Sequence, residues 1–293
     1  MITPADKSPH NDVQPIRTGT FLDRLSGIGG LPRKRITEVF GDAGLGKSTV
    51  LLQSVAHAQK SGARVLWADV EFSFDNRYAE GLGVDSSKLD LLQQQFAEDI
   101  LDEIERAIKD YDLIVLDSIG GLLPRTEAEK GSGEKTIGGQ AGLVARFCRK
   151  VVPLLALNNC ALVVINHSFT DIMSGAVKTS GGAKLEYHKS LSIRLRKSNK
   201  VIKKGEKVIG KVVIGQVKKN KLAGTEGLEV ESNLLFGEGF SAQEDTLAEA
   251  IERGIFTKDG NTYSFAGERI GMISKLREWM KDEANAAKVK EML

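Results

Sequence analysis

The sequence predicts an α/β fold with a largely parallel central sheet flanked by helices, followed by a small C-terminal α+β domain. Three observations lead to this prediction. Apolar strands alternate with helical segments along most of the chain, as expected when helices cover both faces of a parallel sheet. A glycine-rich turn joins the first of these strands to the first long helix. The composition changes at residues 237–239, after which the segments become shorter.

The glycine-rich turn has the pattern of a phosphate-binding loop. It reads Gly41-Asp42-Ala43-Gly44-Leu45-Gly46-Lys47-Ser48. The β-forming stretch 35–40 precedes it, and apolar residues at helical spacing follow from Thr49. In such a context, backbone N–H groups at a helix N-terminus surround a phosphate. We expect Lys47 to reach the β- and γ-phosphates and the Ser48 hydroxyl to ligate Mg²⁺, with Thr49 as a further nucleotide contact.

Composition limits the other classes of function. The chain has 293 residues and a net charge of +2, so any affinity for nucleic acid must come from local clusters of charge. Cys148 and Cys160 lack the spacing of a metal site, and we expect two buried thiols in a reduced cytoplasm. Neither a signal peptide nor an apolar run of membrane-spanning length is present, which predicts a cytoplasmic protein without a membrane partner.

Two acidic residues come directly after apolar strands. Glu71 follows the strand expected over 64–70, where a carboxylate beside a phosphate loop could orient or deprotonate water. The alternative is an ordinary acid at a helix N-terminus. Asp117 ends the strand expected over 113–117, and this Walker B pattern predicts a carboxylate that holds the Mg²⁺ shell.

Three further candidates are less specific on the residues alone. Asp75 and Tyr78 lie on a short helical segment, where the spacing of Tyr78 favours a core position over contact with a base. His167 ends the strand expected over 161–167. A lone histidine is more often structural, but this position at a strand tip favours contact with phosphate.

Two stretches have the composition of functional loops. Residues 125–142 are rich in glycine and mixed in charge, and Arg146 follows on the next helix as a candidate DNA contact. Residues 168–178 form the second loop, after which Gly181-Gly182 opens another helix. Apolar loop side chains suit insertion between bases, and glycines at a helix start suit a phosphate backbone. A buried lid is the alternative. The apolar candidates are Phe169, Ile172 and Met173.

A basic segment follows at 194–221, with eleven Lys or Arg residues against the single acid Glu206. Alternation predicts two strands with a turn at 203–206. A solvated hairpin would explain most of these charges, but the cluster at 218–221 is too dense for solubility alone. With a flexible arm at the start, we expect three units: 1–18, 19–237 and 238–293.

From about Gly19 onward, these motifs resemble the RecA recombinase family. The resemblance implies a RecA-type P-loop ATPase core and assigns roles to the matching positions. Glu71 would activate water, Asp75 and Tyr78 would hold adenine, and the stretches 125–142 and 168–178 would be two mobile DNA-binding loops. Lys219 and Lys221 would reach across to the ATP of the neighbouring protomer.

The resemblance also implies an activity and its partners. They are ATP hydrolysis with Mg²⁺, helical filaments on single-stranded DNA, and pairing with double-stranded DNA. Bacterial members have glutamine where this chain has His167, whereas the phage recombinase UvsX is similar to this chain in having histidine. The resemblance thus fits a phage-encoded or otherwise divergent member. Two alternatives stay open: a nucleotide-binding paralogue with a regulatory or DNA-binding role, and a ring-forming helicase or ATPase on the same core.

Overall fold

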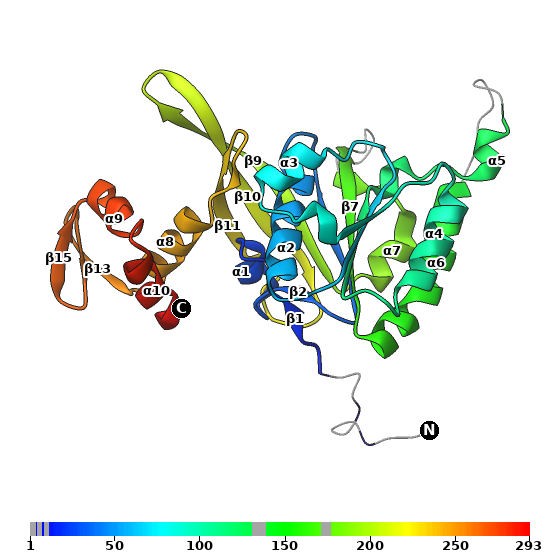
Figure 1. Ribbon diagram of the computed structural model, residues 1–293, viewed down its shortest axis with the longest axis horizontal. Helices are drawn as coiled ribbons and strands as arrows, with labels where there is room; N and C mark the ends of the chain where they lie inside the picture. Colours follow the sequence, from blue (N-terminus) through cyan, green and yellow to red (C-terminus); the bar gives the residue numbers. More distant parts are fainter. Residues whose placement is uncertain (1–3, 5–7, 9–11, 131–138, 171–176) are drawn as a thin grey trace.

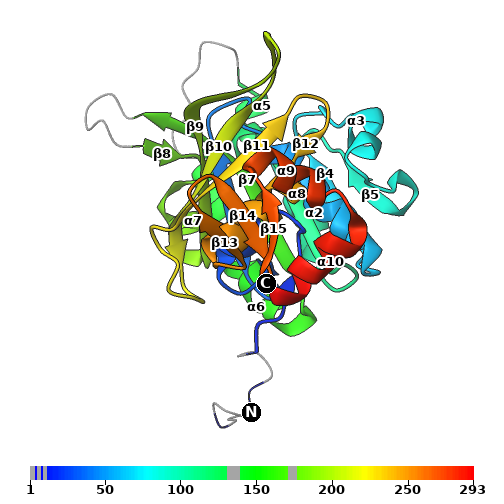
Figure 2. The same ribbon diagram turned by 90° about the vertical axis from the view of Figure 1, so that its left-hand side faces the viewer.

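The computed structural model describes residues 4, 8, 12–130, 139–170 and 177–293. The main body is a sheet with helices on both faces, and a smaller unit from the end of the chain lies beside it (Figure 1). Figure 2 looks onto this smaller unit, with its strands in front of the central sheet. The predicted α/β class with a small C-terminal α+β unit is therefore confirmed.

Strands and helices alternate along most of the chain. The strands are β1 Pro15–Ile16, β2 Leu31–Pro32, β3 Ile36–Gly41, β4 Val65–Asp69, β5 Leu89–Leu92, β6 Leu113–Asp117, β7 Ala161–Thr170, β8 Val177–Thr179, β9 Leu191–Lys204, β10 Lys207–Asn220, β11 Glu229–Leu235, β12 Gly239–Phe240, β13 Phe256–Asp259, β14 Thr262–Phe265 and β15 Glu268–Gly271. The helices are α1 Leu22–Ser26, α2 Lys47–Lys60, α3 Asn76–Gly81, α4 Ala97–Ala107, α5 Arg125–Ala128, α6 Gly139–Asn158, α7 Gly182–His188, α8 Ala242–Glu252, α9 Ile273–Trp279 and α10 Glu283–Met292, with 3-10 turns η2 Ser86–Lys88 and η3 Ile119–Gly121. No helix in these described ranges is long and apolar enough to cross a membrane.

The central sheet has the strand order β12-β11-β10-β9-β3-β7-β6-β4-β5, and β8 pairs with β7. The strands from β9 to β5 in this order are parallel, whereas β9, β10, β11 and β12 pair antiparallel. Gly41 lies opposite His167, and Asp69 lies opposite Asp117. The carboxyl ends of β3, β7, β4 and β6 therefore meet at one edge of the sheet.

Two apolar clusters fill the space between the sheet and its helices. One packs α1, α2 and α3 against one face, and the other packs α4, α6 and α7 against the opposite face. Strands covered on both sides bury every residue, which explains the continuous apolar run of β6. The predicted three-layer arrangement follows from this packing.

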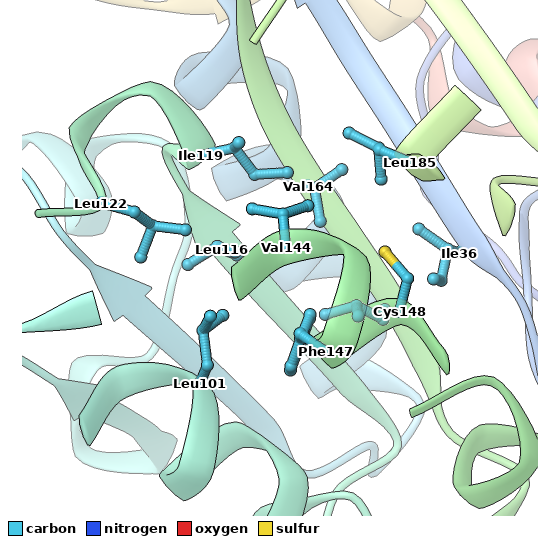
Figure 3. Close-up of a pocket in the computed structure, with 11 residues that line it drawn as sticks. Ile36, Leu101, Leu116, Ile119, Leu122, Val144, Phe147, Cys148, Val164 and Leu185 are labelled. Carbon is cyan, nitrogen blue, oxygen red and sulfur yellow. The ribbon is translucent and has the colours of Figure 1, made fainter. Parts of the chain in front are cut away.

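The second cluster encloses a small cavity between β6, β7 and the helices α4, α6 and α7 (Figure 3). Its lining consists of hydrocarbon side chains and the thiol of Cys148. Burial raises the pKa of Cys148 to about 11 and that of Cys160 to about 12, so both thiols stay protonated and unreactive. The cavity therefore belongs to the core, and the cysteines are buried and free as expected.

β9 and β10 form the predicted hairpin, which extends beyond the body of the molecule (Figure 1). Its turn falls at residues 205–206, because residues 203–204 of the expected turn belong to β9. Part of its charge is paired, since Arg196 and Lys200 each contact a carboxylate of β11, at 2.7 Å.

The ends of the central body include residues outside the expected core limits. Ile16 is buried in β1, which pairs with β2, and Phe240 in β12 packs against Phe21 with ring centroids 5.0 Å apart. The third apolar cluster, which includes Phe256 and Leu276, holds the small unit together from Leu247 onward. The boundaries expected at 18 and 237 stay predictions.

A buried carboxylate lies where α8 joins the central body. Asp245 is 7% exposed, and its Oδ2 has no hydrogen-bond partner among the described residues. Burial raises the pKa of Asp245 to about 7, while the Ser232 hydroxyl and the Arg24 guanidinium lower it in part. Arg24 of α1 also contacts Glu249, at 3.9 Å, and Glu252. One face of α8 thus presents three carboxylates toward one guanidinium.

This arrangement predicts a stability that depends on pH. A carboxyl group with a raised pKa in the folded chain binds its proton more tightly there, so stability falls as pH rises. For Asp245 the loss accumulates between the ordinary value of 3.8 and about 7, and is complete above it. Asp245→Asn should therefore melt several degrees higher than the wild type near pH 8, with little difference near pH 4. Circular dichroism melts measure this, with the exposed Glu268→Gln as control; equal melting temperatures near pH 8 contradict it.

Candidate nucleotide and DNA site

The phosphate loop, residues 41–46, joins β3 to α2. Gly44 and Gly46 have φ values of 71° and 80°, in the left-handed region that favours glycine. A Cβ at Gly46 would lie 2.8 Å from the ring of Phe240, so a side chain is excluded there. Leu45 turns its side chain into the first apolar cluster, which leaves only its backbone for a ligand. The loop is a backbone cradle at a helix N-terminus, and it fits a phosphate.

Lys47 and Ser48 begin α2 at the base of this cradle. The Lys47 ammonium donates to the carbonyls of Gly41 and Asp42, each at 3.0 Å, and burial lowers its pKa. The Ser48 hydroxyl donates to Asp117 Oδ2 at 2.7 Å. Burial raises the pKa of Asp117 to about 6. A hydroxyl and a carboxylate side by side are hard oxygen ligands, so this pair fits the predicted Mg²⁺.

Glu71 and His167 lie together at the same edge of the sheet. Glu71 Oε1 accepts a hydrogen bond from Ser118 Oγ at 2.5 Å and lies 3.4 Å from His167 Nε2. The side chains of Glu71 and His167 are 40% and 43% exposed. The carboxylate is thus open to solvent, held from β6 and β7, and beside the phosphate loop.

The two residues expected near the base lie next to the first turn of α2. The Asp75 carboxylate caps α3 by accepting from the backbone N–H of Tyr78 at 2.8 Å. The Tyr78 hydroxyl lies 2.8 Å from Thr49 Oγ1, and the residue is 39% exposed. The core position favoured by its spacing is therefore wrong, because the residue lies at the surface.

Lys219 and Lys221 lie far from the phosphate loop of their own chain. Lys219 is the second-last residue of β10 and Lys221 directly follows that strand. β10 ends opposite Leu191, the amino end of β9. Because β9 and β3 are parallel, this is the opposite edge of the sheet from the phosphate loop. Lys219 donates to the carbonyl of Glu186, and Lys221 donates to that of Tyr187 at 2.8 Å. Both lysines therefore cap the last turn of α7.

The candidate DNA contacts surround the carboxyl end of β7. Phe169 is 51% exposed on β7. Gly181 and Gly182 have φ values of 90° and 72° and begin α7, and Arg146 is exposed on α6. Two further candidates lie outside the described residues: Ile172 and Met173.

Parts of both expected loops are regular structure. Residues 168–170 of β7 pair antiparallel with β8, so the second loop has a hairpin stem. The first loop begins with α5, and residues 139–142 already belong to α6. The expectation of continuous loops is corrected at these residues. Composition alone hid these elements, because α5 and β8 are only four and three residues long and residues 139–142 of α6 include two glycines.

A buried charged network was missed by the sequence analysis. Glu38 of β3 is fully buried and accepts from Lys189 Nζ at 2.6 Å, Ser192 Oγ at 2.8 Å and Asn166 Nδ2 at 2.9 Å. Asn166 Nδ2 also donates to the carbonyl of Ser180, at 2.8 Å. The available signal was an acidic residue in an otherwise apolar strand.

Comparison with known proteins identifies the family. The family model of the RecA N-terminal domain matches residues 2–241. The chain belongs to the RecA family. Protein RecA of Ureaplasma parvum serovar 3 is 35% identical, over 91% of this chain and 81% of the relative. Protein RecA of Geobacter sulfurreducens is 36% identical, over 89% and 78%.

A third relative, protein RecA of Bordetella petrii, is 32% identical over 96% of this chain and 80% of its own length. The similarity thus extends beyond the N-terminal domain into the small C-terminal unit. This RecA family member is a RecA-type recombinase, and neither the regulatory paralogue nor the ring-forming helicase is favoured.

The Glu38 network predicts a large loss of stability when its charge is removed. Glu38→Gln leaves the Lys189 ammonium buried without its main partner, which costs about 3 kcal/mol. This cost is at the lower end for such pairs because Glu186 also contacts Lys189. Urea unfolding measures it. The exposed pair of Glu103 and Arg106 supplies the control, since Glu103→Gln should change stability by less than about 1 kcal/mol. Equal small effects would contradict the prediction.

Proposed function

We propose that the protein hydrolyses ATP in response to DNA and forms helical filaments on single-stranded DNA, which it pairs with double-stranded DNA. The supporting observation is the placement of Lys219 and Lys221 at the sheet edge opposite the phosphate loop. Two such surfaces can meet only between different copies of the chain. A head-to-tail contact of this kind that does not close produces a helical filament.

Within one chain, the polar groups at the sheet edge that carries the phosphate loop have distinct roles. Backbone N–H groups of the loop and Lys47 would hold the phosphates, and Ser48 and Asp117 would hold Mg²⁺. The metal ion supplies neutralisation of phosphate charge. Glu71 orients and deprotonates the attacking water, and Tyr78 and Asp75 flank the base.

The neighbouring copy completes the site. Lys219 and Lys221 of that copy would approach the γ-phosphate and stabilise the charge on it. Loss of the γ-phosphate removes this contact, so hydrolysis weakens the interface between subunits. In this proposal, bound ATP favours the assembled filament and its hydrolysis favours dissociation of the subunits.

The candidate DNA contacts on β7 are close in sequence to His167, at the sheet edge that carries the phosphate loop. His167 and Phe169 are two residues apart on β7, and the Ser168 hydroxyl between them donates to the Asp42 carboxylate in the phosphate loop. Amides at the start of α7 and Arg146 suit phosphates of a single strand, and Phe169 suits a place between bases. Sequence is then read by base pairing between strands.

Lys47→Ala tests the phosphate site. Removing this charge should lower DNA-stimulated ATP turnover by about two orders of magnitude and abolish the nucleotide-dependent gain in DNA affinity. Anisotropy of labelled single-stranded DNA, with and without a slowly hydrolysed ATP analogue, measures the second effect. Lys60→Ala, at the other end of α2, is the matched control. Full nucleotide dependence in Lys47→Ala would contradict the site.

A mixing experiment tests the contact between subunits. Lys219→Ala with Lys221→Ala should keep nucleotide binding by the monomer but lose DNA-stimulated hydrolysis. Mixing this double variant with Lys47→Ala should restore part of the turnover, because one partner brings an intact loop and the other intact lysines. Substitution of the exposed hairpin residues Lys200 and Lys203 is the control. No recovery on mixing, or closed rings in electron micrographs, would overturn the filament model.

A further inference from the structure

The turn that follows β6 controls the position of Glu71. We infer that Ser118 is a positioning residue for ATP hydrolysis, which fixes the Glu71 carboxylate so that one oxygen is left for water. The inference rests on the function proposed above, in which Glu71 acts on the attacking water. It assigns a task to a residue that otherwise only follows the Mg²⁺ ligand in sequence.

The first support is the contact itself. Ser118 is fully buried, and its hydroxyl donates to Glu71 Oε1 at 2.5 Å. Glu71 lies in the segment after β4 and its side chain is 40% exposed, so little apolar packing restrains it. A glutamate side chain of this kind has many rotamers in solution, and ordering it needs a compensating interaction. A buried hydroxyl on the rigid end of β6 provides that interaction.

The second support is the close approach of the backbone at η3. A Cβ at Gly121 would lie 3.1 Å from Glu71 Cγ and 3.2 Å from Val70 Cγ1. These distances are tighter than ordinary contacts, so a side chain at this position would displace the glutamate stem. Gly121 therefore leaves the room that the stem occupies, and Ser118 holds the carboxylate.

The third support is the distribution of contacts on the carboxylate. Ser118 and His167 both approach Oε1, and Oε2 accepts no hydrogen bond from any residue in the described ranges. Oε2 is thus available to take a proton from water as the water oxygen bonds to the γ-phosphorus. The bond from that phosphorus to the bridging oxygen breaks, its electron pair stays on ADP, and phosphate leaves.

A double-mutant cycle separates positioning from a merely structural role. Steady-state hydrolysis at saturating single-stranded DNA is compared for wild type, Ser118→Ala, Glu71→Gln and the double variant. Ser118→Ala should lower kcat about tenfold, with the KM for ATP and nucleotide-dependent DNA binding unchanged. In the Glu71→Gln background, Ser118→Ala should cause no further loss, because the group that it positions has already lost its function. A wild-type kcat, or an equal loss in both backgrounds, overturns the inference.

A second variant keeps the test valid if Ser118→Ala folds poorly. Gly121→Ala retains the Ser118 hydroxyl but displaces the glutamate stem, so it should give the same loss of kcat at constant KM. Ser54→Ala is the control, because it removes another buried hydroxyl, bonded to the Val50 carbonyl within α2. Wild-type turnover in Gly121→Ala also contradicts the inference.

The outcomes distinguish this inference from the function on which it rests. If Glu71→Gln retains wild-type turnover, the proposed base is wrong and both fail. If Glu71→Gln is inactive while Ser118→Ala is normal, the proposed function stands and only the positioning role is rejected.

Discussion

The carboxylate of Glu38 on β3 is fully buried, and its partners come from the two strands beside it: Asn166 on β7, and Ser192 on β9 with Lys189 just before it. An unpaired charge at this depth would cost several kcal/mol, so Lys189, Ser192 and Asn166 must stay within hydrogen-bonding distance. The network joins β3, β7 and β9, which lead to the phosphate loop, His167 and the basic hairpin. Through Asn166 the network also reaches Ser180, just before α7. One buried charge therefore fixes the register on which the positions of the nucleotide and DNA candidates depend.

Strand direction places the predicted site residues of one chain at two opposite edges of the sheet. Parallel strands bring their carboxyl ends to one edge, and there the phosphate loop, Glu71, Asp117 and His167 meet. The same rule sends Lys219 to the opposite edge, since β10 runs antiparallel to β9 and ends where β9 begins. Bending of a packed sheet cannot bring Lys219 to the edge that carries the phosphate loop of the same chain. In the proposed function, the need for a second copy is thus a consequence of strand direction.

Local patterns allowed the sequence analysis to locate most of this edge. The phosphate loop is identified by its own spacing, and Glu71 and Asp117 are identified because each follows a buried strand. The Glu38–Lys189 pair could not be found in this way, because its members are 151 residues apart and only the assembled sheet joins them. The stem formed by β7 and β8 was missed for a different reason, since β8 has only three residues, too few to show a strand pattern, and its regularity comes from pairing. Tyr78 shows the limit of spacing, because its partner Thr49 lies on another helix.

Asp117 and Ser118 show how closely the chemistry of this edge is joined. They are successive residues, yet Asp117 contacts Ser48 on α2 while Ser118 contacts Glu71 after β4. In the proposed function, the first contact would lie on the side of the metal ion and the phosphates, and the second on the side of the water. A displacement of β6 would therefore move both sides together. Because β6 is buried on both faces and paired on both edges, such a displacement is resisted by the whole core, and the relative positions of the two carboxylates are set by packing.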